Sequence, residues 1–230
     1  MRTGGSRPGL LDLLAELARH YPPAEELTDP LALIVRENIG YLIDDDRRRA
    51  LFDEFQARVG LQPDAIADAS SEVLLDIARR GGMRPETRVE RWRTIARIVQ
   101  GRCGGDLAGT LRSLPLAQAR GLLKRFPAVG DPGADKVLLF CGVAPRPSLE
   151  SNGVRVLARL GFYEEQRTYP ASYRAATDVL TREGLVEREP LVRAYGLLRD
   201  HGRALCKRSL PSCLACPLDQ VCAHVVVGLL

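Results

Sequence analysis

Apolar residues recur at intervals of three and four along most of the chain, which is the spacing of one face of an α-helix. Gly81-Gly82, Gly104-Gly105 and Pro115 interrupt the pattern. We expect helices at residues 10–21, from 28 through 43, then 50–59, 63–67, 71–80, 89–101, 106–113, 115–125, 131–140, 154–160, 169–183 and 189–205. Runs of β-branched residues are short and the loops between helices are short, so the pattern predicts a compact all-α protein.

One pair of these helices is joined by a very short connection. The helix at 115–125 is followed by Pro127-Ala128-Val129-Gly130, and Asp131 with Pro132 is a suitable N-cap and first-turn pair for the next helix. In a helix–hairpin–helix arrangement, the free N–H groups of the second helix and of the hairpin point outward together, and a DNA phosphate fits such a site. An ordinary helical hairpin inside a core is the alternative that these residues leave open.

Composition and charge exclude some classes of protein for this sequence. The formal net charge of +4 permits nucleic-acid binding only if the cations cluster on one face. No apolar run approaches the roughly 20 residues of a membrane span. The apolar run at 10–18 contains Asp12 and Glu16, which a secretory signal would not tolerate. We therefore expect a cytoplasmic protein whose six cysteines stay reduced.

Four of the cysteines lie close together near the end of the sequence. They are Cys206, Cys213, Cys216 and Cys222. Their C-x6-C-x2-C-x5-C pattern can surround one metal centre, and a zinc site more often has two C-x2-C pairs. The spacing therefore favours a [4Fe–4S] cluster, with zinc as the alternative. Cys103 and Cys141 lie in predicted helices, where we expect small buried hydrophobic side chains.

The cysteine pattern and the hairpin together resemble the endonuclease III family of helix-hairpin-helix DNA glycosylases. His201-Gly202-Arg203 precedes a cysteine loop like that of the family, and FPAVGDPGA, which begins at Phe126, is similar to its LPGVGxxxA hairpin. The segment LESNGVRVLAR at 149–159 is similar to LDGNVKRVLAR, which carries the catalytic Asp in the adenine glycosylase branch. The resemblance covers residues 28–222. Eight residues follow the last cysteine, so we expect no counterpart of that branch's C-terminal recognition domain.

The resemblance implies a two-lobed all-α fold. Residues 28–147 would form a six-helix barrel that carries the helix–hairpin–helix at about 115–140. Residues 1–27 and 148–230 would form the second lobe and hold a [4Fe–4S] cluster on the four cysteines. The implied function is base excision repair, by a DNA glycosylase that hydrolyses the N-glycosidic bond of a damaged or mismatched base in double-stranded DNA. We expect a monomer, associated with the nucleoid.

The resemblance also implies two catalytic carboxylates. Breaking the glycosidic bond develops positive charge on the sugar, which a carboxylate stabilises, and negative charge on the departing base, which an acid can relieve. Glu150 matches the family's catalytic Asp but is one methylene longer. Glu37 lies in a segment similar to the helix that supplies the catalytic Glu of the adenine branch. Inside an apolar helix Glu37 would be desolvated and could stay protonated, and a structural Glu paired with Arg36 or another Arg is the alternative.

Bifunctional members of the family hold a lysine just after the hairpin, where its neutral amine attacks C1′ of the sugar and forms a Schiff base. In ungapped register that position is Pro132, which has no nucleophile. Lys136 lies one helical turn further on and would need a rearranged arm. The resemblance therefore predicts a monofunctional glycosylase, and a non-catalytic or lyase-competent DNA-binding protein of the same fold is the alternative.

Several residues near the hairpin and the cysteines are suited to contact DNA. Those expected to do so are Lys124, Arg125, Ala128, Val129, Gly130, Asn152, Arg155, Lys207 and Arg208. A flipped nucleotide also leaves a gap that a side chain must fill. Tyr41 and Leu42 follow Glu37 by one helical turn, and Met83 is a further candidate, although a core methionine is the favoured interpretation of Met83.

Overall fold

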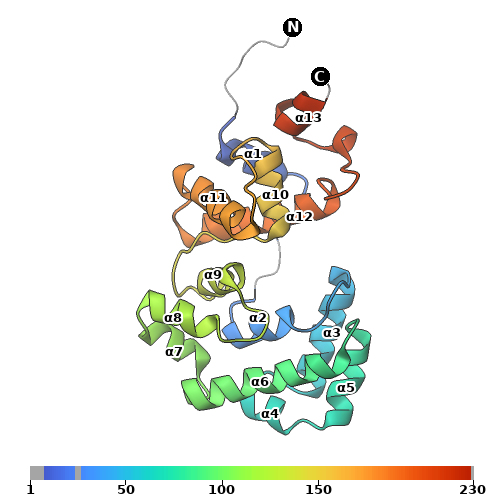
Figure 1. Cartoon of the computed structure of the whole chain (residues 1–230), viewed down its shortest axis with the longest axis vertical. Coiled ribbons are helices and arrows are strands. Elements are labelled where there is room, and N and C mark those ends of the chain that lie inside the picture. The colour runs from blue at the N-terminus through green and yellow to red at the C-terminus, as the bar shows by residue number, and fades with distance from the viewer. Residues whose placement is uncertain (1–7, 24–26, 229–230) are drawn as a thin grey trace. The chain divides into compact units, whose positions relative to one another are not determined.

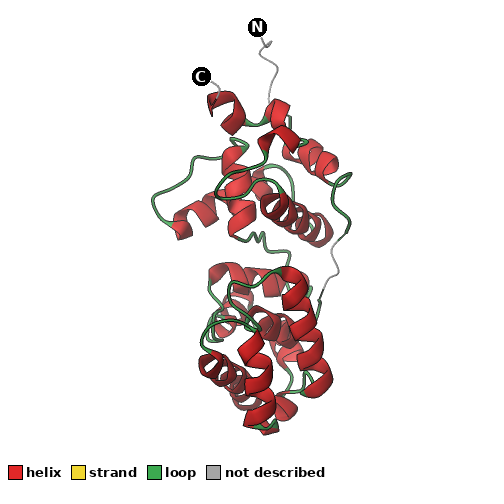
Figure 2. Ribbon diagram, turned by 90° about the vertical axis from the view of Figure 1, so that its right-hand side faces the viewer, coloured by secondary structure: helices red, strands yellow, loops and turns green. Residues whose placement is uncertain are grey.

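The structure is a computed structural model that describes residues 8–23 and 27–228, apart from the side chains of 226–228. These residues form α-helices, two short 3₁₀ turns and loops, so the predicted all-α class is confirmed (Figure 1 and Figure 2). The chain divides into two compact units. We call residues 27–143 the central unit, and the described parts of 1–26 and 144–230 the terminal unit.

The central unit contains eight helices among its described residues. They are α2 (Pro30–Glu37), α3 (Asp45–Arg58), α4 (Pro63–Asp68), α5 (Ser71–Arg80), α6 (Pro85–Cys103), α7 (Leu107–Ser113), α8 (Leu116–Leu123) and α9 (Asp131–Phe140). The long helix α6 packs against both α4 and α5. Trp92 of α6 and Phe55 of α3 are fully buried, with ring centroids 4.8 Å apart. This aromatic pair lies at the core of the unit.

Aspartate side chains cap the first turn of three of these helices, α2, α3 and α7. Asp29 accepts a hydrogen bond from the Ala32 amide at 2.7 Å, and Asp44 accepts one from the Arg47 amide at 2.8 Å. Each carboxylate satisfies a backbone N–H that has no partner within its helix. Because Asp44 caps α3, that helix begins earlier than the 50–59 segment predicted from its apolar residues.

Helix α2 ends at Glu37, so the predicted continuation of this helix to residue 43 is wrong. Asn38 stops the helix, because its side-chain amide donates both to the Ile34 carbonyl and to the Pro127 carbonyl, each at 3.0 Å. Gly40 follows in a tight turn, where an added Cβ would come within 2.2 Å of the Ile43 side chain. The run of apolar residues thus continues past Glu37, while the helical conformation of the backbone ends there.

The terminal unit contains five helices among its described residues. They are α1 (Leu10–Leu17), α10 (Ser151–Arg159), α11 (Tyr169–Arg182), α12 (Arg188–Ala204) and α13 (Ala223–Gly228). Helix α12 packs against α1 and α10, and α10 also packs against α11 (Figure 1). Helix α1 ends at Leu17, earlier than the predicted Tyr21, because residues 18–20 form a turn. The cysteine loop joins α12 to α13 and contains two 3₁₀ turns, Cys213–Ala215 and Asp219–Val221.

None of the helices in the described ranges is both long and apolar enough to cross a membrane.

Candidate functional site

The predicted helix–hairpin–helix is present in the central unit, between α8 and α9. The N-cap of α9 is Gly130 rather than the expected Asp131, which is the first residue of the helix. Ala128 has a left-handed backbone with φ of 61°, which turns the chain sharply. Asn38, just after α2, donates to the Pro127 carbonyl and so ties the hairpin to the rest of the unit.

The hairpin does not expose all three residues that were expected to contact DNA. Ala128 and Gly130 are exposed. The Val129 side chain is buried, and the Val129 amide donates to the Phe126 carbonyl at 3.2 Å. Both the side chain and the amide of Val129 are used to close the turn, and contact of Val129 with DNA stays a prediction.

Acidic side chains neutralise part of the positive charge beside the hairpin. Asp131 lies 2.7 Å from the Lys124 ammonium and 3.0 Å from the Arg120 guanidinium. The hydrogen bond from Lys124, helped by Arg120, lowers the pKa of Asp131. Buried Asp135 pairs with Arg120 at 2.7 Å. Lys124 thus already has an anionic partner, whereas Arg125 is an exposed cation at the same end of α8.

Glu37 and Lys136 form an ion pair within the central unit, with Oε1 and Nζ 2.5 Å apart. The Glu37 side chain is 44% exposed, so it is not enclosed by apolar neighbours. Desolvation alone would raise the pKa of Glu37, but Lys136, together with Arg48 and Arg36, outweighs it and lowers the pKa. The prediction that Glu37 stays protonated is therefore wrong. A lysine from α9 supplies the counter-charge that the alternative interpretation assigned to an arginine.

Three large apolar side chains are exposed on two turns of the central unit. Tyr41 is 59% exposed, Leu42 80% and Met83 65%, and we call them the apolar turn cluster. The Tyr41 amide donates to the Gly81 carbonyl at 2.9 Å, which holds the two turns together. Gly82 allows this approach, because an added Cβ would lie 2.6 Å from the Tyr41 carbonyl oxygen. The favoured interpretation of Met83 as a core residue is wrong.

Glu150 occupies the N-cap position of α10, but its carboxylate makes no capping hydrogen bond. Its Oε1 instead accepts a hydrogen bond from the Asn152 side-chain amide at 2.5 Å. Glu150 is partly exposed, while the preceding Ser148 and Leu149 are buried and anchor the backbone. The carboxylate is therefore oriented at the surface without being used to begin the helix.

Tyr169, at the start of α11, is a neighbour of Glu150 that the sequence does not reveal. Burial raises the pKa of Tyr169, and the negative charge of Glu150 adds to this shift. The Tyr169 ring remains 45% exposed and lies 6.4 Å from the ring of Tyr173. The proximity depends on how α11 packs against α10, so no local pattern signals it.

A chain of hydrogen bonds runs from Glu150 to the cysteine loop within the terminal unit. Asn152, which holds Glu150, accepts a bond from Arg155 at 2.6 Å through its Oδ1. Arg155 also donates to the carbonyls of Gly202 at 2.9 Å and Cys206 at 3.0 Å. Burial lowers the pKa of Arg155. Internal partners hold both side chains in place, and contact of Asn152 and Arg155 with DNA stays a prediction.

Arg159, one turn further along α10, holds the start of the cysteine loop. It donates to the Lys207 carbonyl at 2.7 Å and to the Arg208 carbonyl at 3.0 Å, and it lies 3.4 Å from the Cys206 sulfur. The side chains of Lys207 and Arg208 are exposed. Arg159 therefore fixes the backbone of these two residues while their cationic groups stay accessible.

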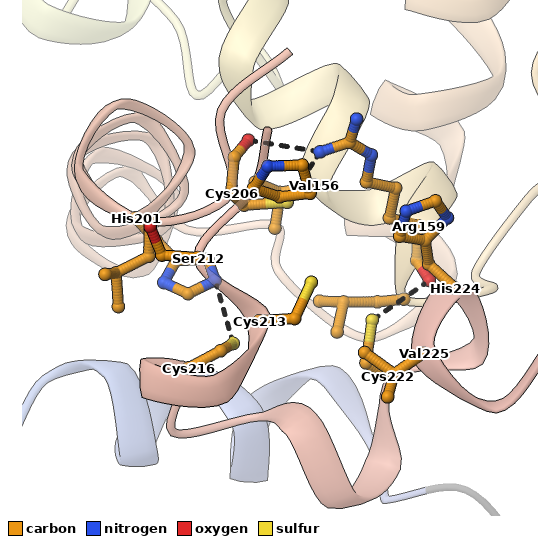
Figure 3. A pocket seen from close by; sticks show the side chains of 13 residues that line it. Val156, Arg159, His201, Cys206, Ser212, Cys213, Cys216, Cys222, His224 and Val225 are labelled. Carbon is orange, nitrogen blue, oxygen red and sulfur yellow. Dashed lines mark hydrogen bonds between the residues drawn. The ribbon is translucent and has the colours of Figure 1, made fainter. Parts of the chain in front are cut away.

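The four cysteines of the loop line one pocket (Figure 3). They are Cys206, Cys213, Cys216 and Cys222. Burial raises the pKa of Cys216 to about 11 and also raises the pKa of Cys222. No group of three or more His, Cys, Asp or Glu side chains in the described ranges is arranged to hold a single metal ion. Four thiols around one pocket are, however, the donor set of a [4Fe–4S] cluster, which spans more space than one ion.

The two other cysteines differ in burial. Cys103 is buried at the end of α6, as expected. Cys141 is only half-buried, because it lies at the C-cap of α9 rather than inside the helix. The prediction of a buried helical side chain is therefore wrong for Cys141.

His201, in the last turn of α12, is the only histidine of the described residues that is buried. Its Nδ1 lies 3.1 Å from the Tyr21 hydroxyl, and its Nε2 lies 3.6 Å from the Cys216 sulfur. Burial lowers the pKa of His201 to about 4. The sequence marks His201 as part of a motif, but it gives no sign that Tyr21 is its partner.

Known proteins resemble this chain over most of its length, although no family model matches it. The thymine-DNA glycosylase of Aeropyrum pernix is 27% identical over 209 residues, which are 88% of this chain and 86% of that protein. The thymine/uracil-DNA glycosylase of Pyrobaculum aerophilum is 26% identical, with 94% and 90% covered. Endonuclease III of Thermotoga maritima is 25% identical, with 92% and 91% covered.

Solved structures share the fold of this chain. A trapped covalent intermediate of endonuclease III with DNA matches it with a TM-score of 0.75 and 18% identity, covering 96% of this chain and 97% of that one. A thermostable thymine-DNA glycosylase matches with a TM-score of 0.71 and 15% identity, covering 94% and 96%. The fold expected from the hairpin and cysteine motifs is therefore confirmed.

Proposed function

The chain belongs to the endonuclease III-like family of helix-hairpin-helix DNA glycosylases, and from this we propose its substrate bases and its catalytic residues. It is a DNA N-glycosylase of base excision repair, and the proposed substrates are thymine and uracil in mismatched double-stranded DNA. The observation that carries the catalytic assignment is the partly exposed carboxylate of Glu150, which Asn152 orients at the start of α10.

The proposed substrate follows from the names of the relatives and from the chemistry of the bases. Two relatives are named for thymine, and one of these also for uracil. Thymine is a normal base, so an enzyme that excises it has to act where thymine is mispaired. Deamination turns cytosine into uracil and 5-methylcytosine into thymine, each opposite guanine. Uracil or thymine opposite guanine is therefore the substrate class that we assign.

Glu150 is proposed to act on the sugar side of the bond. As the N-glycosidic bond breaks, positive charge develops on the sugar, and a nearby carboxylate stabilises it more than it stabilises the ground state. The reaction adds one water, with its hydroxyl going to C1′ and its proton to the departing base. Asn152 holds the carboxylate in one orientation, so less reorganisation is needed at the transition state. Glu37 is ionised beside Lys136 and is not assigned as a proton donor.

Each unit carries its own exposed cations that are proposed to contact DNA. Arg125 lies at the hairpin, and Lys207 and Arg208 lie on the cysteine loop with backbones fixed by Arg159. Such side chains bind phosphates and position the duplex without reading its sequence. The apolar turn cluster supplies side chains of a size that can fill the gap left by a flipped base.

Replacing Lys207 tests the proposed contact between the cysteine loop and DNA. Lys207→Ala is expected to lower the slope of log affinity against log salt concentration by about one and to weaken binding of all duplexes alike. Fluorescence anisotropy with labelled duplexes at several salt concentrations measures the slope. Lys207→Arg is the matched control, since it keeps the charge and should keep the slope. An unchanged slope for Lys207→Ala would remove this residue from the interface.

The cofactor that we propose is a [4Fe–4S] cluster held by Cys206, Cys213, Cys216 and Cys222. The support is the donor set of four thiols around one pocket and the similarity to endonuclease III proteins. When bound, the cluster would join four points of the loop and hold it in one conformation. The loop carries Lys207 and Arg208, so the cofactor would act on DNA binding rather than on bond breaking.

A trapping experiment tests whether the enzyme is monofunctional. Pro132 offers no amine, and the Lys136 ammonium is paired with Glu37, which favours its charged and non-nucleophilic form. We therefore expect the product strand to break only after alkali treatment, and borohydride to trap no protein–DNA adduct. Gel electrophoresis of duplexes with uracil or thymine opposite guanine, with and without alkali or borohydride, measures both outcomes.

Each other outcome of this experiment has a definite meaning. An adduct that disappears in Lys136→Ala would show that Lys136 leaves Glu37 and attacks the sugar, which contradicts the monofunctional proposal. Strands that stay intact even after alkali would mean that no base is released. Together with normal duplex binding, that result would favour a non-catalytic DNA-binding member of the family.

A further inference from the structure

Buried His201 and half-buried Tyr21 form a pair of polar side chains that the proposed reaction does not use. His201 is 2% exposed and lies in α12, while Tyr21 follows α1 at the other end of the chain. The Tyr21 hydroxyl and His201 Nδ1 are 3.1 Å apart, and their rings meet edge to face. The other ring nitrogen, Nε2, is directed at the Cys216 sulfur at 3.6 Å (Figure 3). Packing of α1 against α12 brings the pair together.

The direction of these hydrogen bonds follows from the chemistry of the sulfur. A cysteine that binds a metal centre is a thiolate, which accepts hydrogen bonds and has no proton to donate. Nε2 of His201 must therefore carry a proton, whatever the charge of the ring. In the neutral ring Nδ1 then has no proton, so the Tyr21 hydroxyl donates to it. Tyr21 thus selects the tautomer that directs an N–H at Cys216.

Cys216 receives a second donor from its own loop. The Leu218 amide lies 3.4 Å from the Cys216 sulfur. Hydrogen bonds to a thiolate ligand disperse its negative charge, and they favour the more negative, reduced state of an iron–sulfur cluster. Two donors on one ligand therefore affect the electronic properties of the cluster as well as the packing of the loop.

We propose that Tyr21 and His201 are positioning residues for the cofactor. Tyr21 donates to His201, and His201 donates a hydrogen bond to the Cys216 thiolate, which raises the reduction potential of the [4Fe–4S] cluster. This inference rests on the proposed cluster. It makes the segment after α1 part of the cluster environment, although that segment supplies no ligand. It also gives a reason for a polar histidine at this buried position.

The test compares the midpoint potential of the cluster in the purified full-length protein with that of variants. His201→Phe keeps a ring but removes both nitrogens, and Tyr21→Phe removes only the hydroxyl. Both are expected to shift the midpoint to more negative potential, the first by more than the second. His201→Gln is expected to shift the midpoint less than His201→Phe does, because its side-chain amide can replace Nε2–H as donor.

Tyr163→Phe is the matched control. It also removes a tyrosine hydroxyl from the terminal unit, where Tyr163 donates to the Val154 carbonyl at 3.0 Å, but Tyr163 is not among the residues that line the cysteine pocket. Its midpoint should equal that of the wild type. Spectroelectrochemical titration, checked by electron paramagnetic resonance of the reduced protein, measures the potentials, and iron analysis measures loading.

The results separate this inference from the cofactor assignment. A fully loaded wild type and fully loaded Tyr21→Phe and His201→Phe variants with the same midpoint would overturn the inference and leave the cluster in place. In that case the pair would only fill space, and only the melting temperature would change. If His201→Phe does not fold, Tyr21→Phe alone decides. A wild type that contains zinc and no iron would overturn both the cofactor and the inference.

Discussion

Glu150→Gln is expected to lower the single-turnover rate of base excision by about 100-fold or more, which corresponds to about 2.7 kcal/mol of lost transition-state stabilisation. Glutamine keeps the size of the side chain and can still hydrogen-bond to Asn152, so the orientation at the start of α10 should survive. What it removes is the negative charge, which matters only while positive charge develops on the sugar. Duplex affinity should therefore change little.

Two further variants make this result specific. Glu150→Asp is expected to retain activity and could exceed the wild type, because it restores the shorter carboxylate of the family. Glu187→Gln is the matched control, since Glu187 is also a glutamate at a helix N-cap that makes no capping bond. It should excise at the wild-type rate. Equal rates for Glu150→Gln and Glu187→Gln would exclude Glu150 from the chemistry.

Cys216→Ser is expected to have the largest effect on stability. Loss of one ligand should abolish cluster binding. Without its metal centre the protein loses the binding free energy that also stabilises the fold, on the order of several kcal/mol. The loss should fall on the terminal unit, where the cysteine loop contacts α10 through Arg155 and Arg159. Iron analysis, together with amide hydrogen exchange followed by mass spectrometry, measures both effects.

The exchange pattern distinguishes this effect from a general loss of folding. Protection should fall in α10 and α12, while α6 in the central unit keeps its protection. Cys141→Ser is the control, because Cys141 lies at the end of α9 and outside the loop. It should retain full iron and full protection. Wild-type protection in Cys216→Ser, with no loss of iron, would show that Cys216 is not a ligand.

Local patterns predict the parts of the fold that depend on neighbours in sequence. Asp29 starts α2 because its carboxylate reaches an amide three residues ahead, and that geometry is encoded in the Asp-Pro pair. The hairpin and the cysteine spacing are equally local, so both can be recognised from the sequence. The helix at 71–80 is predicted to the residue for the same reason, since Ser70 caps its first turn.

Several of the errors concern residues whose partners are distant in sequence. Asn38 ends α2 through a bond to Pro127, so the apolar run after it could not reveal the end of the helix. Glu37 is ionised because Lys136 lies beside it, 99 residues later in the chain. In each case the decisive contact is set by the packing of helices.

The exposure of the apolar turn cluster has the same origin. The residue type of Met83 favours a core position, because methionine is usually buried. In the structure the bond between Tyr41 and Gly81 joins two surface turns, and Met83 lies beyond them in solvent. The sequence offered both interpretations of Met83, and only the fold decides between them.

The release of free base from DNA by the wild-type protein tests the central claim most directly. Excess protein is incubated with a duplex that contains uracil or thymine opposite guanine, and mass spectrometry measures the free base and the mass of the strand in a single turnover. We predict one free pyrimidine per duplex and a strand that remains unbroken with an abasic site. The absence of free base from both duplexes, under conditions in which the protein binds them, would contradict the account.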